Sequence, residues 1–165
     1  MVVNEEQSPS HERLHLYLND HLAGSITAIE MIDNVIEQHP GDRFGEFLRQ
    51  LRVEIQADQE QLRDLIQKVG AEESTIRKAG AWVAEKLSRA KVGDAGDSVE
   101  LLQAMEGLVL GITGKKLLWR SLGAVEQNFP ALQGVDFGEL QQRADEQWQR
   151  VETLRIELTR EVFRQ

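Results

Sequence analysis

The sequence predicts an all-α protein, organised as a left-handed bundle of four long helices with an additional, shorter crossover helix. Four segments of similar length carry apolar residues at alternating steps of three and four, the spacing of a left-handed bundle seam. Prolines and glycine-containing stretches separate these segments. No segment shows the strict alternation of apolar and polar residues that indicates a β-strand.

The first predicted helix spans residues 9–38. Ser8-Pro9 supplies an N-cap followed by proline at the first helical position, and Pro40-Gly41 stops the segment. The apolar seam of this helix consists of Leu18, Leu22, Ile29, Ile32 and Ile36. We expect residues 1–8 to be a flexible N-terminus and residues 9–165 to form a single bundle domain.

Residues 42–69 form the second predicted helix, and Gly70 follows it as a C-cap would. Its seam consists of Phe44, Leu48, Leu51, Ile55, Leu62, Leu65 and Val69. A shorter helix is expected over residues 74–91, where a crossover between two helical hairpins would lie. One side of this crossover helix carries Ile76, Ala79, Trp82, Val83 and Leu87.

The last two helices are predicted over residues 98–123 and 136–164, with Pro130 between them. The seam of the fourth helix is assigned to Leu102, Met105, Val109, Ile112 and Trp119. The seam of the fifth is assigned to Phe137, Leu140, Ala144, Val151, Leu154 and Leu158. Four rods of matching length imply a four-helix bundle.

Composition narrows the class of protein. A chain of 165 residues with 41% hydrophobic and 28% charged residues suits one folded domain. The absence of cysteine excludes disulfides, Cys-ligated metals and a Cys nucleophile. A net charge of −9 argues against nucleic acid and anionic membranes as partners. The start of the chain lacks the features of a signal peptide. The longest uncharged stretch of the most apolar segment is residues 107–114, which is too short to span a membrane. A cytoplasmic protein is therefore expected.

Two long hairpins joined by a crossover resemble the ferritin-like superfamily, over about residues 10–164. Members of that superfamily place one Glu on each of two helices and a Glu-x-x-His on each of the other two, as ligands for a di-metal site. The single glutamates correspond here to Glu30 and Glu106, and the motif glutamates to Glu54 and Glu152.

The two ligand histidines of that pattern are missing. Ala57 follows Glu54 at the third position, and Arg155 follows Glu152. A guanidinium stays protonated and cannot bind a metal, but it can compensate carboxylate charge. The resemblance therefore implies a ferritin-like scaffold whose metal site is replaced by a structural ion-pair cluster, made up of Glu30, Glu54, Glu106, Glu152 and Arg155.

Glu106 is the only charge in the apolar run from Leu101 to Ile112, which predicts an interior polar cluster with Arg155 as its counter-ion. The other interpretation is a boundary residue that reaches solvent past Gly107.

Other polar residues fall on predicted core positions, namely Asp58, Lys116 and Gln147. They are expected to fix the register of the helices or, alternatively, to line a cavity. Asp58 shares a helix face with Glu54, so the pair could also bind a cation.

One side of the fourth predicted helix lacks side chains at three glycines, Gly107, Gly111 and Gly114. Close approach of another helix, with that of Trp82 as a candidate, would offset their cost, and opening space for a small ligand is the second interpretation. His11 and His15 have a spacing that could bind a metal, but without an accompanying Glu-His signature an end-capping or surface role is predicted.

Three functions remain open from the sequence. The first is a non-catalytic ferritin-like protein without a cofactor, whose working surface is an interaction face. The second is an iron- or manganese-binding oxidoreductase with the histidine-poor ligands Glu30, Glu54, Asp58, Glu106 and Glu152. The third is a helical bundle that binds a small ligand beside the glycines. Apolar residues on the predicted outer faces, namely Leu117, Leu118, Trp148 and Phe163, also predict a homodimer.

Overall fold

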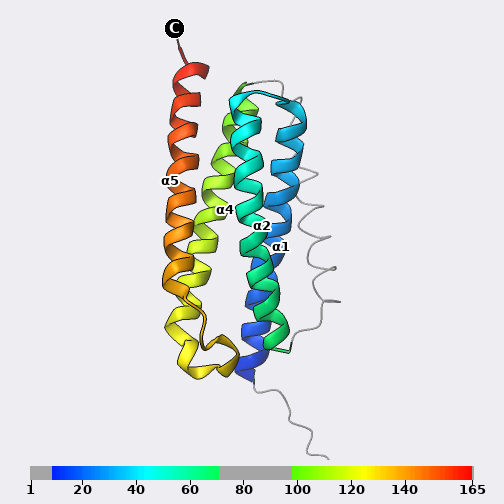
Figure 1. Cartoon of the computed structure of the whole chain (residues 1–165), viewed down its shortest axis with the longest axis vertical. Coiled ribbons are helices and arrows are strands. Elements are labelled where there is room, and N and C mark those ends of the chain that lie inside the picture. Colours follow the sequence, from blue (N-terminus) through cyan, green and yellow to red (C-terminus); the bar gives the residue numbers. More distant parts are fainter. Residues whose placement is uncertain (1–8, 71–97, 165) are drawn as a thin grey trace, which may run out of the picture.

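The computed structural model describes residues 9–70 and 98–164, and this part of the chain is helical without strands. It contains four long helices and two short 3-10 turns (Figure 1). Their bounds are α1 Pro9–Gln38, α2 Arg43–Lys68, α4 Ser98–Val125, η1 Glu126–Asn128, η2 Pro130–Leu132 and α5 Phe137–Val162. The all-α class and the four long helices are thus confirmed. The predicted crossover helix 74–91 and the N-terminal residues 1–8 lie outside the described residues.

The helices form two hairpins, α1 with α2 and α4 with α5, and α1 also packs against α4. Figure 1 shows that α2 and α4 run in the same direction, while α1 and α5 run in the opposite one. The end of α2 and the start of α4 therefore lie at opposite ends of the bundle.

Side-chain caps fix where two helices begin. Asp42 precedes α2, and its Oδ1 accepts hydrogen bonds from the backbone N–H groups of Phe44 and Gly45 at 2.9 Å each. Asp136 precedes α5 and accepts from the backbone N–H of Glu139 at 2.9 Å. Such caps satisfy backbone donors that have no partner within the helix.

Two apolar clusters fill the bundle, an upper one and a lower one in the view of Figure 1. The upper cluster includes Ile32, Leu51, Met105 and Val151, and the lower one includes Leu18, Leu65, Trp119 and Leu140. On α2 the buried Asp58 falls between Ile55 of the upper cluster and Leu62 of the lower one, and on α5 the buried Gln147 falls between Ala144 and Val151 of the upper cluster. Polar side chains therefore interrupt the hydrophobic core.

The inward face of α4 agrees with the predicted seam in part. Leu102, Met105, Ile112 and Trp119 are buried as predicted, and Val109 is partly buried. The inward row also includes Leu101, Leu108, Lys115 and Leu122, so its centre is turned by about one position from the predicted seam at Val109 and Lys116. The shift decides which lysine enters the core.

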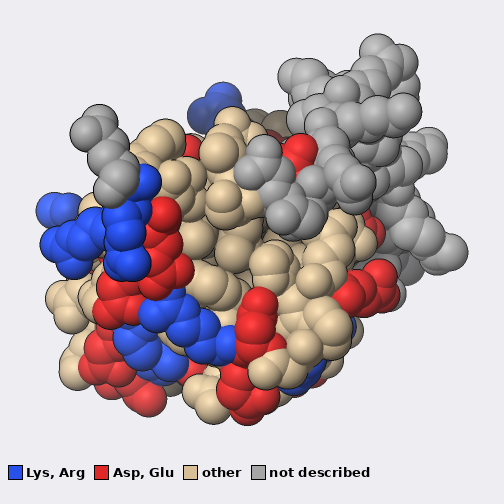
Figure 2. Space-filling model, turned by 90° about the horizontal axis from the view of Figure 1, so that it is seen from above, with Lys and Arg blue, Asp and Glu red and all other residues tan. Residues whose placement is uncertain are grey.

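Charged side chains connect α2 and α5 along the surface. Near the upper end Arg43 pairs with Glu157 at 3.3 Å and also with Glu161, and further down Arg150 pairs with Glu54. Figure 2, seen from above, shows acidic and basic side chains interleaved along one side of the molecule. Exposed pairs of this kind contribute little to stability individually.

Within the two described ranges, no helix carries an apolar stretch long enough to cross a membrane.

Candidate functional site

A cavity of about 450 Å³ lies among α1, α2 and α4. This volume falls within the range of about 300–1,000 Å³ that is typical of small-molecule sites. Most of its wall is apolar and belongs to Ile55, Leu62, Leu108, Ile112, Leu118 and Trp119. We refer to it as the α1–α2–α4 cavity.

Glycines from two facing helices open the cavity. A Cβ atom added to Gly24 on α1, or to Gly111 or Gly114 on α4, would meet no atom within 4 Å. At Gly107, in contrast, an added Cβ would lie 3.4 Å from the Sδ of Met31 on α1. A Cβ at Gly107 would thus make an ordinary van der Waals contact with Met31, whereas Gly111 and Gly114 border open space, as the second interpretation of the sequence predicted.

A buried polar network lies at the inner wall of the cavity. The Asp58 carboxylate, with 2% of its side chain exposed, pairs with the ammonium of Lys115 at 2.6 Å and with the guanidinium of Arg143 at 2.7 Å. The Gln147 amide donates to Asp58 at 3.2 Å, and its oxygen accepts from Lys115. The network therefore joins α2, α4 and α5 and holds two cations around one carboxylate.

Burial changes the acid–base behaviour of Lys115. Removal of its ammonium from water lowers its pKa below the ordinary 10.5, and the positive charge of Arg143 acts in the same direction. Attraction to Asp58 opposes this effect without cancelling it. The lysine is thus a charged group that the fold holds at an energetic cost.

Polar groups of α1 line the same cavity. His21 packs edge-on against Tyr17, with ring centroids 4.7 Å apart. Burial lowers the pKa of His21 below 6.5, although the nearby Asp20 opposes the shift, so the ring is mostly neutral at neutral pH. Ser25 accepts a hydrogen bond from the Gln59 amide at 3.0 Å, which ties α1 to α2 at the wall.

Trp119 contributes to the cavity wall and carries an unpaired donor. The residue is 1% exposed, and its Nε1–H has neither a hydrogen-bond partner nor appreciable accessible surface. Buried polar groups of folded proteins are nearly always paired, so this N–H is an exception among the described residues.

The predicted counter-ion Arg155 does contact two of the predicted glutamates. Its guanidinium donates twice to Glu152 at 2.7 Å and lies 3.7 Å from Glu106. However, the prediction that Glu106 lies in the interior is wrong, since 53% of its side chain is exposed. Glu106 lies beyond the apolar stripe of its helix, which is the boundary position that the other interpretation described.

The remaining predicted glutamates do not join this group. Glu54 pairs with Arg150 of α5, and Glu30 is exposed. Among the residues that the structure describes, no three His, Asp or Glu side chains come together as a group that could hold a metal ion.

The sequence located two members of the buried network and missed two. Asp58 and Gln147 are buried, as their core positions predicted. Lys116 is not in the core, because it lies on the α5 side of α4 and pairs with Asp145. Its neighbour Lys115 takes the core position. The buried row Leu101, Leu108 and Leu122 was the signal that could have identified this lysine, whereas the role of Arg143 had no local signal.

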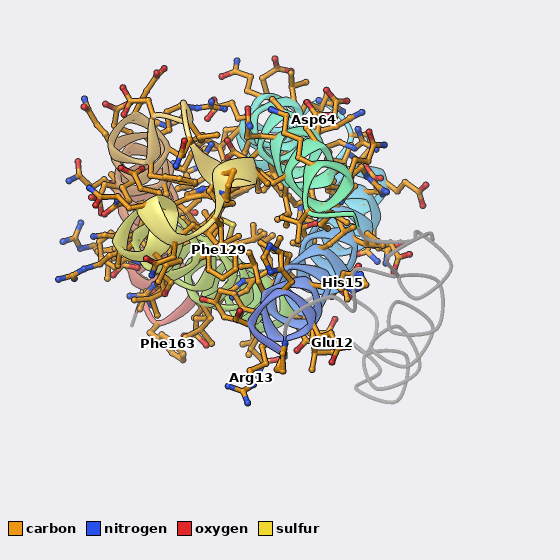
Figure 3. The ribbon with its side chains drawn as sticks, turned by 90° about the horizontal axis from the view of Figure 1, so that it is seen from below. Glu12, Arg13, His15, Asp64, Phe129 and Phe163 are labelled. Atoms are coloured by element: carbon orange, nitrogen blue, oxygen red, sulfur yellow. The ribbon has the colours of Figure 1, made fainter. Side chains whose placement is uncertain are left out.

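The two histidines near the start of α1 have separate surroundings. His11 packs edge-on against Phe129, at 5.1 Å between ring centroids, and the Nε2 of His15 is buried without a hydrogen-bond partner. Figure 3, seen from below, shows Phe129 on the connection that closes this end of the bundle, while Arg13 points away from it. The contact of His11 agrees with the end-capping role.

A second, more open groove lies between α2 and α5 and includes Phe47, Glu54, Arg150 and Leu154. The two charged groups in that set pair with each other. The α1–α2–α4 cavity is the better candidate because it combines apolar walls with a buried charged network.

Comparisons of the chain with protein-family models, with curated proteins and with solved structures found no match.

Proposed function

We propose that this protein is a helical bundle that binds a small, largely apolar ligand in the α1–α2–α4 cavity. The observation that carries the proposal is the opening at Gly24, Gly111 and Gly114, beside a buried charged network. Of the three functions that the sequence left open, the geometry favours the small-ligand binder.

The energetics support the same proposal. A glycine in a helix interior costs about 1 kcal/mol relative to alanine. No described side chain lies within 4 Å of the Cβ position of Gly111 or Gly114, so no described contact offsets this cost there. A bound ligand would supply the missing packing, and apolar burial yields about 25 cal/mol per Å² of surface removed from water.

The proposal can be tested by filling the cavity. We expect the neutral fluorescent probe N-phenyl-1-naphthylamine to bind the wild-type protein at one site. Gly111→Leu should weaken this binding by more than about tenfold without unfolding the bundle, because the new side chain enters open space. Thr113→Leu adds a similar side chain at an exposed position of the same helix and is the matched control.

Two results would contradict the proposal: no binding of the probe to the wild-type protein, or equal binding to the wild type and to Gly111→Leu. The sequence also offered the helix of Trp82 as a neighbour of the glycines, and this residue lies outside the described ranges. If Trp82→Ala raised the affinity for the probe, Trp82 would compete with the probe for the cavity. The cavity would then be a packing site for that segment and not a ligand site.

The ferritin-like class and a non-catalytic role remain part of the proposal. The order of helix directions supports the ferritin-like class, because two hairpins that run in this order require one long connection, as in ferritin-like folds. The iron or manganese alternative is tested by elemental analysis of protein produced with both metals. About two ions per chain, lost on substitution of Glu30 and Glu106, would favour the oxidoreductase.

The homodimer also remains a prediction. Leu117, Trp148 and Phe163 are exposed, but Leu118 is buried in the lower cluster and cannot contribute to an outer patch. Light scattering of the purified protein tests this prediction, and a monomer at high concentration would remove it.

A further inference from the structure

One donor in the cavity wall lacks an acceptor among the described residues. An ammonium has three N–H groups, and Lys115 uses two of them, one toward Asp58 and one toward Gln147. Lys115 lines the cavity, so a bound molecule would find the third N–H without an acceptor. The indole N–H of Trp119 is also unpaired, but its nitrogen has almost no accessible surface.

Most acceptors in the same wall face donors or cations. Asp58 Oδ2 accepts from Lys115 and Gln147, while Asp58 Oδ1 lies 2.7 Å from the Arg143 guanidinium without a hydrogen bond. The Ser25 hydroxyl accepts from Gln59 while donating to the backbone oxygen of Leu22. A cationic ligand would have to displace Lys115 or Arg143 from Asp58, which would leave a buried cation without its partner. An anion requires no such exchange.

Charges of both signs surround Lys115. The guanidinium of Arg143 lies on the far side of Asp58, while the carboxylates of Asp58 and Glu54 attract the ammonium. His21 is mostly neutral at neutral pH, and Asp20 is exposed, so solvent screens its charge more effectively. A negative group next to Lys115 would also relieve the burial of its ammonium, because an opposite charge favours the charged form.

We propose that the ligand of the α1–α2–α4 cavity is an anionic amphiphile, with an apolar tail against the leucine and isoleucine wall and one carboxylate-like head group bound by Lys115. This inference rests on the proposed function and names its ligand class. Lys115 is the binding residue that distinguishes the charge of the head group. Asp58 and Gln147 position its ammonium.

The test compares three probes with the same ten-carbon tail, namely decanoate, 1-decanol and decyltrimethylammonium. Isothermal titration calorimetry on the full chain, below the micelle concentrations, measures each dissociation constant. We expect decanoate to bind at least about tenfold more tightly than the alcohol, and the ammonium compound to bind most weakly. Lys115→Met should abolish the preference for decanoate while retaining the affinity for 1-decanol.

Lys116→Met is the matched control, because this neighbouring lysine pairs with Asp145 outside the cavity. It removes the same charge from the chain and should leave the preference for decanoate intact. Retained binding of 1-decanol shows that Lys115→Met is folded around an open cavity. If that variant does not fold, the ranking of the three probes on the wild-type protein still decides.

The outcomes separate the two proposals. Equal binding of decanoate and 1-decanol to the wild type would overturn the anionic ligand and leave the apolar cavity standing. Tightest binding of the ammonium compound would reverse the assigned charge. An unchanged decanoate preference in Lys115→Met would remove this lysine from the site. Binding of none of the probes would overturn the proposed function itself.

Discussion

Two ion clusters of opposite composition lie in this bundle. In one, the carboxylate of Asp58 is held between Lys115 and Arg143, and 2% of its side chain is exposed. In the other, the guanidinium of Arg155 lies between Glu152 and Glu106, and more than half of the Glu106 side chain is exposed. Arg155 lies 2.7 Å from Glu152 but 3.7 Å from Glu106, whereas both contacts of Asp58 are 2.7 Å or shorter. The comparison indicates that burial, and not the number of pairs, decides how much a cluster contributes to stability.

The largest effect is expected from Asp58→Ala. This substitution leaves the ammonium of Lys115 and the guanidinium of Arg143 without their shared carboxylate. Removal of one partner from a buried pair costs about 3–5 kcal/mol, so we expect a loss of that size in the free energy of unfolding. Chemical denaturation at neutral pH measures it.

Asp145→Ala is the control, because Asp145 pairs with Lys116 and both side chains are far more exposed than Asp58, at 46% and 40%. A change within about 0.5 kcal/mol is expected there. If Asp58→Ala lowered the free energy of unfolding no more than Asp145→Ala does, the buried network would contribute no more to stability than the pair at the surface. The double variant Asp58→Leu with Lys115→Met should recover part of the loss, since apolar replacement of both partners is often nearly neutral.

The pH dependence of stability should distinguish the buried cluster on the alkaline side. Because the pKa of Lys115 is lowered from 10.5 in the folded protein, the unfolded state binds more protons between the folded value and 10.5. Over that window the wild-type protein should gain stability relative to Lys115→Met as the pH rises. Denaturant melts of both proteins at a series of alkaline pH values test this, and parallel profiles would contradict it.

Two glycines of α4 test whether the space beside the buried cluster is open. Gly111→Ala should stabilise the protein by about 1 kcal/mol, because alanine favours the helix and its Cβ meets no neighbour. Gly123→Ala is the comparison on the same helix, where the new Cβ would lie 3.3 Å from the Cβ of Phe137. Thermal melts should show a smaller gain or a loss for Gly123→Ala. Equal increases in melting temperature would mean that Phe137 moves away from the new Cβ at position 123 without a cost in stability.

The long helices were predictable because their signals are local. Capping residues, prolines and the apolar seams are read within a few turns of the chain, and the structure places α1 and α2 within one residue of the predicted bounds. The rotation of α4 was not predictable in this way. Apolar residues occur on most sides of this helix, so Val109 and Leu108 were equally plausible seam residues until the partners of the helix were known.

The candidate site was predictable only in part, for the same reason. Asp58 and Gln147 interrupt clear apolar seams and therefore stand out in the sequence. Lys115 was hidden by the ambiguous register of α4, and Arg143 enters the network from a half-exposed position. The prediction for Glu106 was wrong because a charge within an apolar run is buried only when the helix is surrounded on all sides. One face of α4 is open to solvent, as the exposed Leu110 and Leu117 show.

The smallest effect is expected from Arg155→Ala. Its guanidinium binds Glu152 within one turn of the same helix and reaches Glu106 at the surface, so its removal leaves no carboxylate buried. A loss of about 0.5–1 kcal/mol at neutral pH is expected, compared with several kcal/mol at Asp58. Hydrogen bonding to Arg155 lowers the pKa of Glu152 below its ordinary 4.5, so the pair stabilises the folded state above that value and loses this contribution as the pH falls through the folded pKa. The difference between the wild type and Arg155→Ala should therefore be constant near neutral pH and shrink below about pH 4.5. Denaturant melts at neutral and acidic pH measure it. A neutral-pH loss as large as that of Asp58→Ala would show that exposure does not separate the two clusters.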